Sequence, residues 1–321
     1  MSVFHPLFIA ALSGLVSYFG TKKLLPVLKR HVLDMPNARS NHKEPVPRGG
    51  GIAMIGAALL GFLFLGMPLL LILAALLLAY VSFADDRGGL PVRTRLAAQL
   101  VAVALGIHVL PGPVFGAFPG AVEWILVALG WLWFINLTNF MDGIDGISAM
   151  QAIMVSAGIA LIAWTWHMPA YEGAAFVMMA SAWGFYRFNR SPAKLFMGDV
   201  GSVPLGFLMG YLLLSLAAQG YLLSALILPA YYLSDATYTL FRRAKRHEKV
   251  WQAHSEHAYQ QAARGGLSHR QIVSCITRLN ALLIALAFIA SLSMIIGVLC
   301  VIVAYGLTFR LIRHFSHEAV S

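Results

Sequence analysis

Apolar residues recur along the chain in runs of 14 to 21 positions, separated by short polar or Gly/Pro-rich breaks. A helix of about 20 apolar residues is long enough to cross a bilayer. We therefore expect an all-α, polytopic integral membrane protein whose single membrane-embedded domain covers residues 1–321. The expected spans are residues 3 to 21, 50 to 66, 68 to 84, 96 to 110, 121 to 140, 147 to 166, 171 to 186, 201 to 217, 221 to 241, 279 to 292 and 294 to 309. That makes eleven; one long tilted helix over residues 279 to 309 would make ten.

Composition and charge support this interpretation. Of the 321 residues, 59% are hydrophobic and 11% are charged, whereas about a quarter are charged in a soluble domain. All 23 Lys and Arg residues fall in alternate connections, so the positive-inside rule places the N-terminus outside. The net charge of +10 therefore indicates orientation and anionic substrates, and nucleic acid is not an expected partner. The two cysteines, Cys275 and Cys300, have neither disulfide nor metal-ligand spacing.

Five aspartates stand at or just beyond the ends of apolar runs, in loops framed by glycine. They are Asp85, Asp86, Asp142, Asp145 and Asp199. An isolated loop aspartate is usually a solvated turn residue, but clustered carboxylates beside a membrane repel one another and need an offsetting charge. A divalent cation such as Mg²⁺ supplies that charge and commonly bridges one or two carboxylates to a diphosphate.

The spacing of the central acidic motif adds geometry. Asn139, Asp142 and Asp145 recur every three residues, while Gly143 and Gly146 are expected to end the helix between them. The three polar side chains are then free to converge on one pocket. Asp85 and Asp86, in contrast, are about 100° apart on a helix, so one can serve a metal while the other points elsewhere.

Basic and glycine-rich segments lie on the same expected side. They contain Lys43 and Arg48, then Arg95, then Asn189 to Lys194, and they suit phosphate binding as well as membrane anchoring. The run Gly49 to Gly51 has two interpretations, a backbone cradle for phosphate or close helix packing. Both remain open at this point.

A late cytoplasmic loop contains His254 and His257. Their spacing would place two imidazoles on one face of a helix. Zinc needs three or four ligands, and no further ligand is evident, so phosphate binding is favoured.

Taken together, the motifs resemble a known family. The ordered set His42-Lys-Glu-Pro-Val-Pro-Arg-Gly-Gly-Gly51, Asp85-Asp86, Asn139-x-x-Asp-Gly-Ile-Asp-Gly146, Asn189 with Phe196-Met-Gly-Asp199, and the late histidine loop is similar to the polyprenyl-phosphate N-acetylhexosamine-1-phosphate transferases, glycosyltransferase family 4. The resemblance runs from about residue 37 to residue 260. It implies transfer of a sugar 1-phosphate from a UDP-activated N-acetyl amino sugar to undecaprenyl phosphate, releasing UMP. It also implies a Mg²⁺ requirement, with Mn²⁺ as an alternative, and an active site at the cytoplasmic face of the bacterial inner membrane.

The resemblance also implies roles for single residues. Asp199 is expected to bind the metal directly, supported by Asp142 and Asp85, and one of Asp85 and Asp86 would deprotonate the lipid phosphate or assist the metal. The nucleotide pocket would comprise Asn139, Asp142, Asp145, Asn189 and Phe196, with Phe196 stacked on uracil. Phosphate contacts would come from Lys43, Arg48, Arg95, His254 and His257. The lipid bilayer is an expected partner, and a homodimer stays open.

Three alternatives fit the sequence less well. The peptidoglycan branch, the phospho-N-acetylmuramoyl-pentapeptide transferases, carries three consecutive histidines where this chain has His254-Ser-Glu-His257, which favours a branch that initiates O-antigen, lipopolysaccharide or other surface glycans. A transporter or flippase predicts ionisable residues near mid-span and a repeated half, which this chain lacks. The Asp-Gly motif of CDP-alcohol phosphatidyltransferases does not accommodate Ile144-Asp145.

Overall fold

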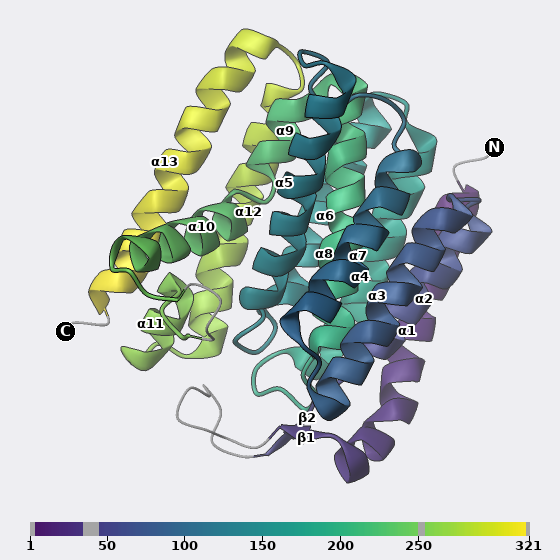
Figure 1. Ribbon diagram of the computed structural model, residues 1–321, viewed down its shortest axis with the longest axis vertical. Coiled ribbons are helices and arrows are strands. Elements are labelled where there is room, and N and C mark those ends of the chain that lie inside the picture. Colours follow the sequence, from purple (N-terminus) through teal and green to yellow (C-terminus); the bar gives the residue numbers. More distant parts are fainter. Residues whose placement is uncertain (1–3, 35–44, 250–253, 319–321) are drawn as a thin grey trace.

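The computed structural model describes residues 4–34, 45–249 and 254–318. Figure 1 shows a bundle of helices that run in roughly similar directions, with one oblique helix and a small two-stranded sheet at one end. The elements are α1 (Phe4–His31), β1 (Leu33–Asp34), β2 (Val46–Pro47), α2 (Gly51–Phe64), α3 (Leu69–Gly88), α4 (Val92–His108), α5 (Gly120–Phe140), α6 (Ile147–Thr165), α7 (Pro169–Asn189), α8 (Asp199–Leu216), a π-helical turn (Ala217–Tyr221), α9 (Leu222–Ile227), α10 (Ala230–Lys245), α11 (Ala258–Arg264), α12 (His269–Ala290) and α13 (Met294–Glu318). The expected all-α polytopic class is confirmed.

Six helical segments in the described ranges are long and apolar enough to cross a membrane. They are α3, α5, α6, the combined α8–α9 segment, α12 and α13. Large apolar side chains cover the outside of the bundle, for example Phe8, Met294 and Ile295, which are 70%, 80% and 79% exposed. Such a surface is unfavourable in water and suits the hydrocarbon of a bilayer.

Residues 279 to 309 belong to two helices. A short turn at residues 291–293 separates α12 from α13, which favours two segments over a single tilted one.

The expected ninth span, residues 221 to 241, is wrong as a continuous helix. Gly220 has a φ of 96° in the π-helical turn, and Pro229 separates α9 from α10. Proline cannot donate the backbone hydrogen bond that a continuous helix needs. In Figure 1, α10 consequently crosses the bundle obliquely. It buries Tyr231 and Asp235 while Tyr238 and Phe241 stay exposed.

Helix α8 is the centre of the bundle. It contacts α2, α3, α5, α6 and α7, and nearly all of its side chains are buried. Trp131 of α5 stacks on Phe207 of α8 with ring centroids 4.9 Å apart, and its indole nitrogen donates to the Phe207 carbonyl at 3.0 Å. This packing fixes the position of the first turn of α8, where Asp199 lies.

The glycine run before α2 is a site of close packing. The N–H groups of Gly50 and Gly51 donate to the carbonyls of Phe196 and Met197, at 2.9 and 3.0 Å. A Cβ atom on Gly51 would lie 2.2 Å from the Cα of Gly201. Of the two open interpretations, close packing is therefore confirmed, because both N–H groups are already bound to backbone carbonyls.

Gly51→Ala should destabilise the protein. The added methyl group meets backbone rather than a movable side chain, so we expect a loss of about 2–3 kcal/mol, the upper part of the range for overpacking. The midpoint of thermal unfolding in detergent measures this effect. Gly56→Ala is the matched control in the same helix, since its Cβ would meet nothing within 4 Å. Equal stability of the two variants would contradict the packing described.

Candidate functional site

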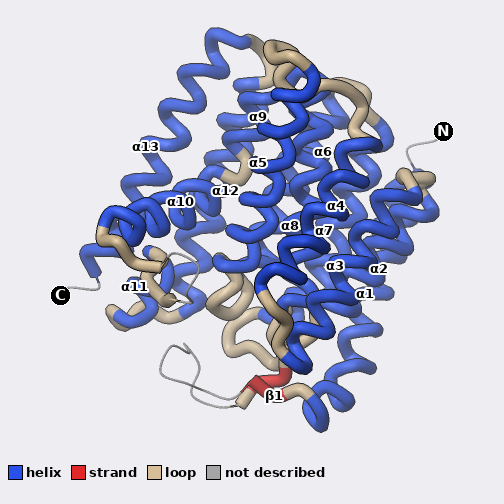
Figure 2. The backbone as a smooth tube through the Cα atoms, in the orientation of Figure 1, coloured by secondary structure: helices blue, strands red, loops and turns tan. Residues whose placement is uncertain are grey.

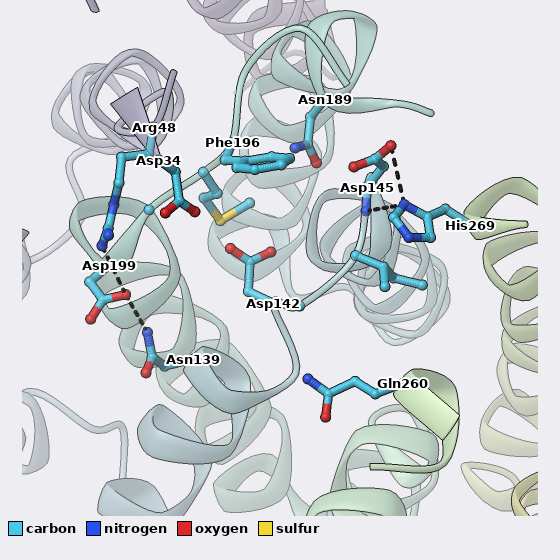
Figure 3. A pocket seen from close by; sticks show the side chains of 14 residues that line it. Asp34, Arg48, Asn139, Asp142, Asp145, Asn189, Phe196, Asp199, Gln260 and His269 are labelled. Atoms are coloured by element: carbon cyan, nitrogen blue, oxygen red, sulfur yellow. Dashed lines mark hydrogen bonds and ion pairs between the residues drawn. The ribbon is translucent and has the colours of Figure 1, made fainter. Parts of the chain in front are cut away.

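A polar cavity of about 240 Å³ lies at the end of the bundle that carries β1 and β2. In Figure 2, β1 and several loops lie at this end of the bundle. Figure 3 shows side chains from segments far apart in the sequence pointing into the cavity. Its labelled lining residues are Asp34, Arg48, Asn139, Asp142, Asp145, Asn189, Phe196, Asp199, Gln260 and His269. The convergence that the spacing of the acidic motif predicts is confirmed.

Asp142 lies at the middle of the cavity wall (Figure 3). Helix α5 ends at Phe140 and α6 begins at Ile147, with Gly146 at a φ of 80°, so the acidic motif forms a loop as expected. Burial raises the pKa of the Asp142 carboxyl to about 7, and the negative charge of Asp199 adds to this shift against a hydrogen bond from Ser148. A cation in the cavity would offset both the desolvation of the Asp142 carboxylate and its repulsion by Asp199.

Asp199 is held in a polar network at the start of α8. The amide nitrogen of Asn139 donates to Asp199 Oδ1 at 3.0 Å and to Ser202 Oγ at 2.9 Å. Arg48 lies on the other side, with Nη2 4.0 Å from Asp199 Oδ1, and it pairs closely with Asp86. Asp199 thus lies in the first turn of α8, at the positive end of the helix dipole.

The opposite wall contains Asp145 and His269. His269 Nδ1 lies 3.2 Å from Asp145 Oδ2, which also accepts from the Ala193 N–H at 3.1 Å. Burial alone would raise the pKa of Asp145, but the hydrogen bond and charge of His269, with the Ala193 N–H, outweigh it and lower the pKa. Asp145 is therefore an ionised anchor for the loop after α7, in contrast to Asp142.

Asn189 connects two loops of the site through its amide. Its Oδ1 accepts from the Gly146 N–H at 3.1 Å, and its Nδ2 donates to the Leu195 carbonyl at 3.0 Å. The side chain is 3% exposed. Asn189, predicted as a nucleotide contact, therefore has a positioning role, because it fixes the acidic loop relative to the loop that carries Phe196.

A second cavity, of about 210 Å³, adjoins the first. Asn139 and Asp199 line both cavities. Asp85 faces the second cavity, where its Oδ2 accepts from Arg95 Nη1 at 2.9 Å. Most other walls are apolar, and Val92 and Leu96 are 49% and 42% exposed on the outside of the bundle. This cavity therefore connects the polar site with exposed apolar side chains at the start of α4.

Asp85 and Asp86 point to different partners, as their angular separation predicts. Asp86 pairs with Arg48 and accepts from the Val200 N–H at 3.3 Å, whereas Asp85 pairs with Arg95. Neither is a lining residue of the polar cavity.

The predicted histidines lie outside the lining of either cavity. His257 is the N-cap of α11 and His254 precedes that helix, so the expected single helix face is wrong, although their rings are 4.8 Å apart. His257 is 2% exposed and lies 3.6 Å from Asp235. Burial, with the charges of His257 and Arg243, lowers the pKa of His254 to about 4, so this side chain is neutral at pH 7. Lys43 lies outside the described residues.

Four lining or supporting residues were not predicted. Gln260 and His269 reach the cavity from α11 and the first turn of α12, Asp34 comes from β1, and Ser202 supports Asn139. Asp34 carries an acidic charge in a basic segment, a weak signal. Nothing in the local sequence distinguishes the other three, because their role comes from packing between distant helices.

The donor set fits a hard divalent cation that keeps part of its shell. In the described ranges, no three His, Cys, Asp or Glu residues are placed to hold a metal ion by themselves. Asp199, Asn139 and Asp142 do offer oxygen donors to the same cavity. Mg²⁺ takes one or two carboxylates and completes its shell with water and substrate phosphates, so an incomplete set of this kind suits it.

Asn189→Ala should destabilise the protein and loosen both loops. Two buried backbone groups lose their partner, and each such loss costs about 1–3 kcal/mol. Thermal unfolding should show a lower midpoint, and hydrogen exchange should show faster exchange at the Gly146 amide. Arg190→Ala, at the exposed neighbouring position, is the control. If the unfolding midpoint of Asn189→Ala were as high as that of the control, the two hydrogen bonds of the Asn189 amide would not contribute to stability.

The comparisons with known proteins agree with this geometry. The family model described as Glycosyl transferase family 4 matches residues 68–217, which run from just before α3 to the end of α8. A probable undecaprenyl-phosphate N-acetylglucosaminyl 1-phosphate transferase of Bacillus subtilis is 26% identical over 281 residues, which cover 81% of this chain and 78% of the relative. The undecaprenyl-phosphate alpha-N-acetylglucosaminyl 1-phosphate transferase of Escherichia coli is 26% identical over 302 residues, 87% of this chain and 82% of the relative.

A third relative is matched over a shorter stretch. The decaprenyl-phosphate N-acetylglucosaminephosphotransferase of Mycobacterium tuberculosis is 28% identical over 232 residues, 61% of this chain and 57% of the relative. The segment that the family model matches contains Asp85, Asn139, Asp142, Asp145 and Asp199, which line the two cavities. Residues 68–217 thus match the Glycosyl transferase family 4 model, and this match and the names of the relatives support a polyprenyl-phosphate hexosamine-1-phosphate transferase family.

Proposed function

We propose that this protein transfers a sugar 1-phosphate from a UDP-activated N-acetyl amino sugar to undecaprenyl phosphate. The observation that carries the proposal is the meeting of a polar cavity and a partly apolar, lipid-facing cavity at Asn139 and Asp199. A nucleotide donor suits the first cavity and a long-chain lipid phosphate suits the second. The names of the relatives support a polyprenyl phosphate as the acceptor.

The chemistry exchanges one phosphoanhydride bond for another. An oxygen of the acceptor phosphate forms a bond to the phosphorus that carries the sugar, and the bond from that phosphorus to the bridging oxygen breaks. UMP leaves with the bridging oxygen, and undecaprenyl-diphosphate-sugar is the lipid product. Two anions must meet, so neutralisation of their charge is the main catalytic requirement.

The chain supplies cations on both sides of the shared wall. Arg48 faces the polar cavity and Arg95 faces the second one. Each already holds a carboxylate, Asp86 and Asp85 respectively. We assign Asp85 to the acceptor phosphate, because it faces the lipid-side cavity, and Asp86 to the positioning of Arg48.

Mg²⁺ is the proposed cofactor, with Mn²⁺ as the alternative. Asp199 would hold it, with Asn139 and Asp142 as oxygen donors from the adjacent loop. When bound, the ion would neutralise the diphosphate and polarise its oxygens. Asp85, which faces the other cavity, would act from the acceptor side rather than as a ligand shared with Asp142.

The nucleotide would lie along the wall formed by Phe196. The Phe196 N–H donates to the Pro47 carbonyl at 2.8 Å and its carbonyl accepts from Gly50, so the backbone holds the ring at the cavity. Figure 3 shows the ring between Asp34 and Asn189. A ring fixed in this way offers a flat face for stacking on uracil.

The proposed pathway rests on the sequence of the histidine loop, and the choice of the first donor rests on the names of the relatives. The His254-Ser-Glu-His257 sequence favours initiation of O-antigen, lipopolysaccharide or another surface glycan, with UDP-N-acetylfucosamine, UDP-N-acetylquinovosamine or UDP-N-acetylglucosamine as donor. The relatives' names make N-acetylglucosamine the first donor to test. A panel of these UDP sugars in one assay of UMP release identifies the substrate. We place the site at the cytoplasmic face of the bacterial inner membrane, since the basic connections lie on that side.

UMP release should depend on Mg²⁺ and on Asp199. With undecaprenyl phosphate and UDP-N-acetylglucosamine, EDTA should abolish release and added Mg²⁺ should restore it. Asp199→Asn should lower kcat by at least about 100-fold, because the carboxylate that holds the ion is lost. Glu172→Gln, in the first turn of α7, is the control with an equal loss of charge. Undiminished release by a folded Asp199→Asn protein would remove Asp199 from the metal site.

Phe196→Ala should raise the KM for the UDP sugar. Loss of a stacking contact of about 1 kcal/mol corresponds to a rise of about fivefold, with little change in the KM for the lipid. Steady-state kinetics with each substrate varied in turn measures both values. Phe118→Ala, at an exposed position in the loop before α5, is the control. If the KM for the UDP sugar did not change, the uracil would have to bind elsewhere.

A further inference from the structure

A third cavity, of about 620 Å³, lies on the far side of Asp145 from the polar site. The end of α7 and the loop after it form one wall and the first turns of α12 form the other. The first wall carries Arg187, Arg190 and Lys194, and the second carries Arg270 and Arg278. The proposed transferase mechanism uses none of these five cations.

The cavity has an excess of positive charge. No carboxylate in the described ranges lies within 4.0 Å of the charged nitrogens of these five residues. Asp145 is the acidic member of the lining, but its Oδ2 is already bound by His269 Nδ1 at 3.2 Å and the Ala193 N–H at 3.1 Å. Cations that line the same cavity repel one another, and an anion bound in that cavity would reduce the repulsion.

The surroundings place this charge beside the apolar surface of the bundle. Trp183 is 51% exposed one turn before Arg187, and its ring lies 5.9 Å from that of Tyr186, which lines the cavity. On α12, Leu282 is 53% exposed one turn beyond Arg278. Both helices therefore pass from cations to exposed apolar side chains within one turn. Exposed Trp is enriched where the hydrocarbon of a bilayer meets its head groups.

We propose that this basic cavity binds the phosphodiester head group of an anionic phospholipid. Guanidinium groups from both walls would contact the phosphate oxygens. The acyl chains would lie along the apolar surface near Trp183 and Leu282. Basic pockets between membrane helices bind anionic head groups in this manner. A free phosphate ion shares the head-group chemistry but would make no use of the adjacent apolar surface.

The test measures retained lipid and needs no enzymatic activity, so its result is independent of the proposed transferase function. The full chain is purified in detergent, delipidated, and mixed with equal amounts of phosphatidylglycerol and phosphatidylcholine of identical acyl chains. Bound lipids are then counted by native mass spectrometry. The cavity variant Arg187→Ala/Arg278→Ala removes one cation from each wall. The control Arg310→Ala/Arg313→Ala removes two exposed cations of α13, which does not line the cavity.

We expect the unaltered chain and the control to retain phosphatidylglycerol over phosphatidylcholine. In the cavity variant, the ratio of bound phosphatidylglycerol to bound phosphatidylcholine should fall about tenfold. Two fully buried cations would give a larger fall. No preference in the unaltered chain would overturn the proposal, as would an equal loss in the two variants or no loss in the cavity variant. In a second arm, inorganic phosphate is titrated and thermal stability is measured. Stabilisation by phosphate that is lost in the cavity variant, without lipid preference, would assign the site to a soluble anion and overturn the lipid.

Discussion

The site depends on one close approach between backbones. Gly50 and Gly51 bind the carbonyls of Phe196 and Met197, and Gly51 lies so near Gly201 that neither position has room for a side chain. This contact joins the start of α2 to the start of α8, two helices separated by more than a hundred residues of chain. It places Arg48 beside Asp199 and holds Phe196 at the wall of the cavity. Without it, the basic segment before α2 would have no fixed relation to the acidic loops.

The electrostatics of the site follow from that geometry. Carboxylates from separate loops share a small cavity, and the two on the acidic loop differ in their surroundings. Asp145 is paired and its pKa is lowered, whereas desolvation and the charge of Asp199 outweigh Arg48 at Asp142 and raise its pKa to about 7. Under the proposed function, a divalent cation that enters with a diphosphate would offset this negative charge. The adjoining lipid-side cavity has its own arginine, so each substrate anion would meet a separate cation at the shared wall.

Much of the fold and part of the site could be predicted from the sequence, for local reasons. Apolar runs of the right length predict helices directly, and the break between α5 and α6 follows from Gly143 and Gly146. The prediction of a continuous helix over residues 221 to 241 was wrong, because hydrophobicity alone cannot distinguish one helix from two helices around Pro229. The prediction that His254 and His257 share one helix face was wrong for a related reason. Their spacing suits one helix face, but the helix begins only after His257. Asn189 was recognised as a site residue, while its role in connecting two loops required their coordinates.

The sequence by itself determined the class of protein, its resemblance to a family and the identity of most polar groups in the site. These properties follow from composition, periodicity and short motifs, which act within a few residues of the chain. Only the tertiary structure decided which cations pair with which carboxylates. It also decided that Gln260 and His269 line the polar cavity whereas His254 and His257 do not. It also decided that arginines from α7 and α12 surround a separate basic cavity. Such pairings depend on how helices distant in sequence pack, and the energy of that packing is distributed over the whole bundle.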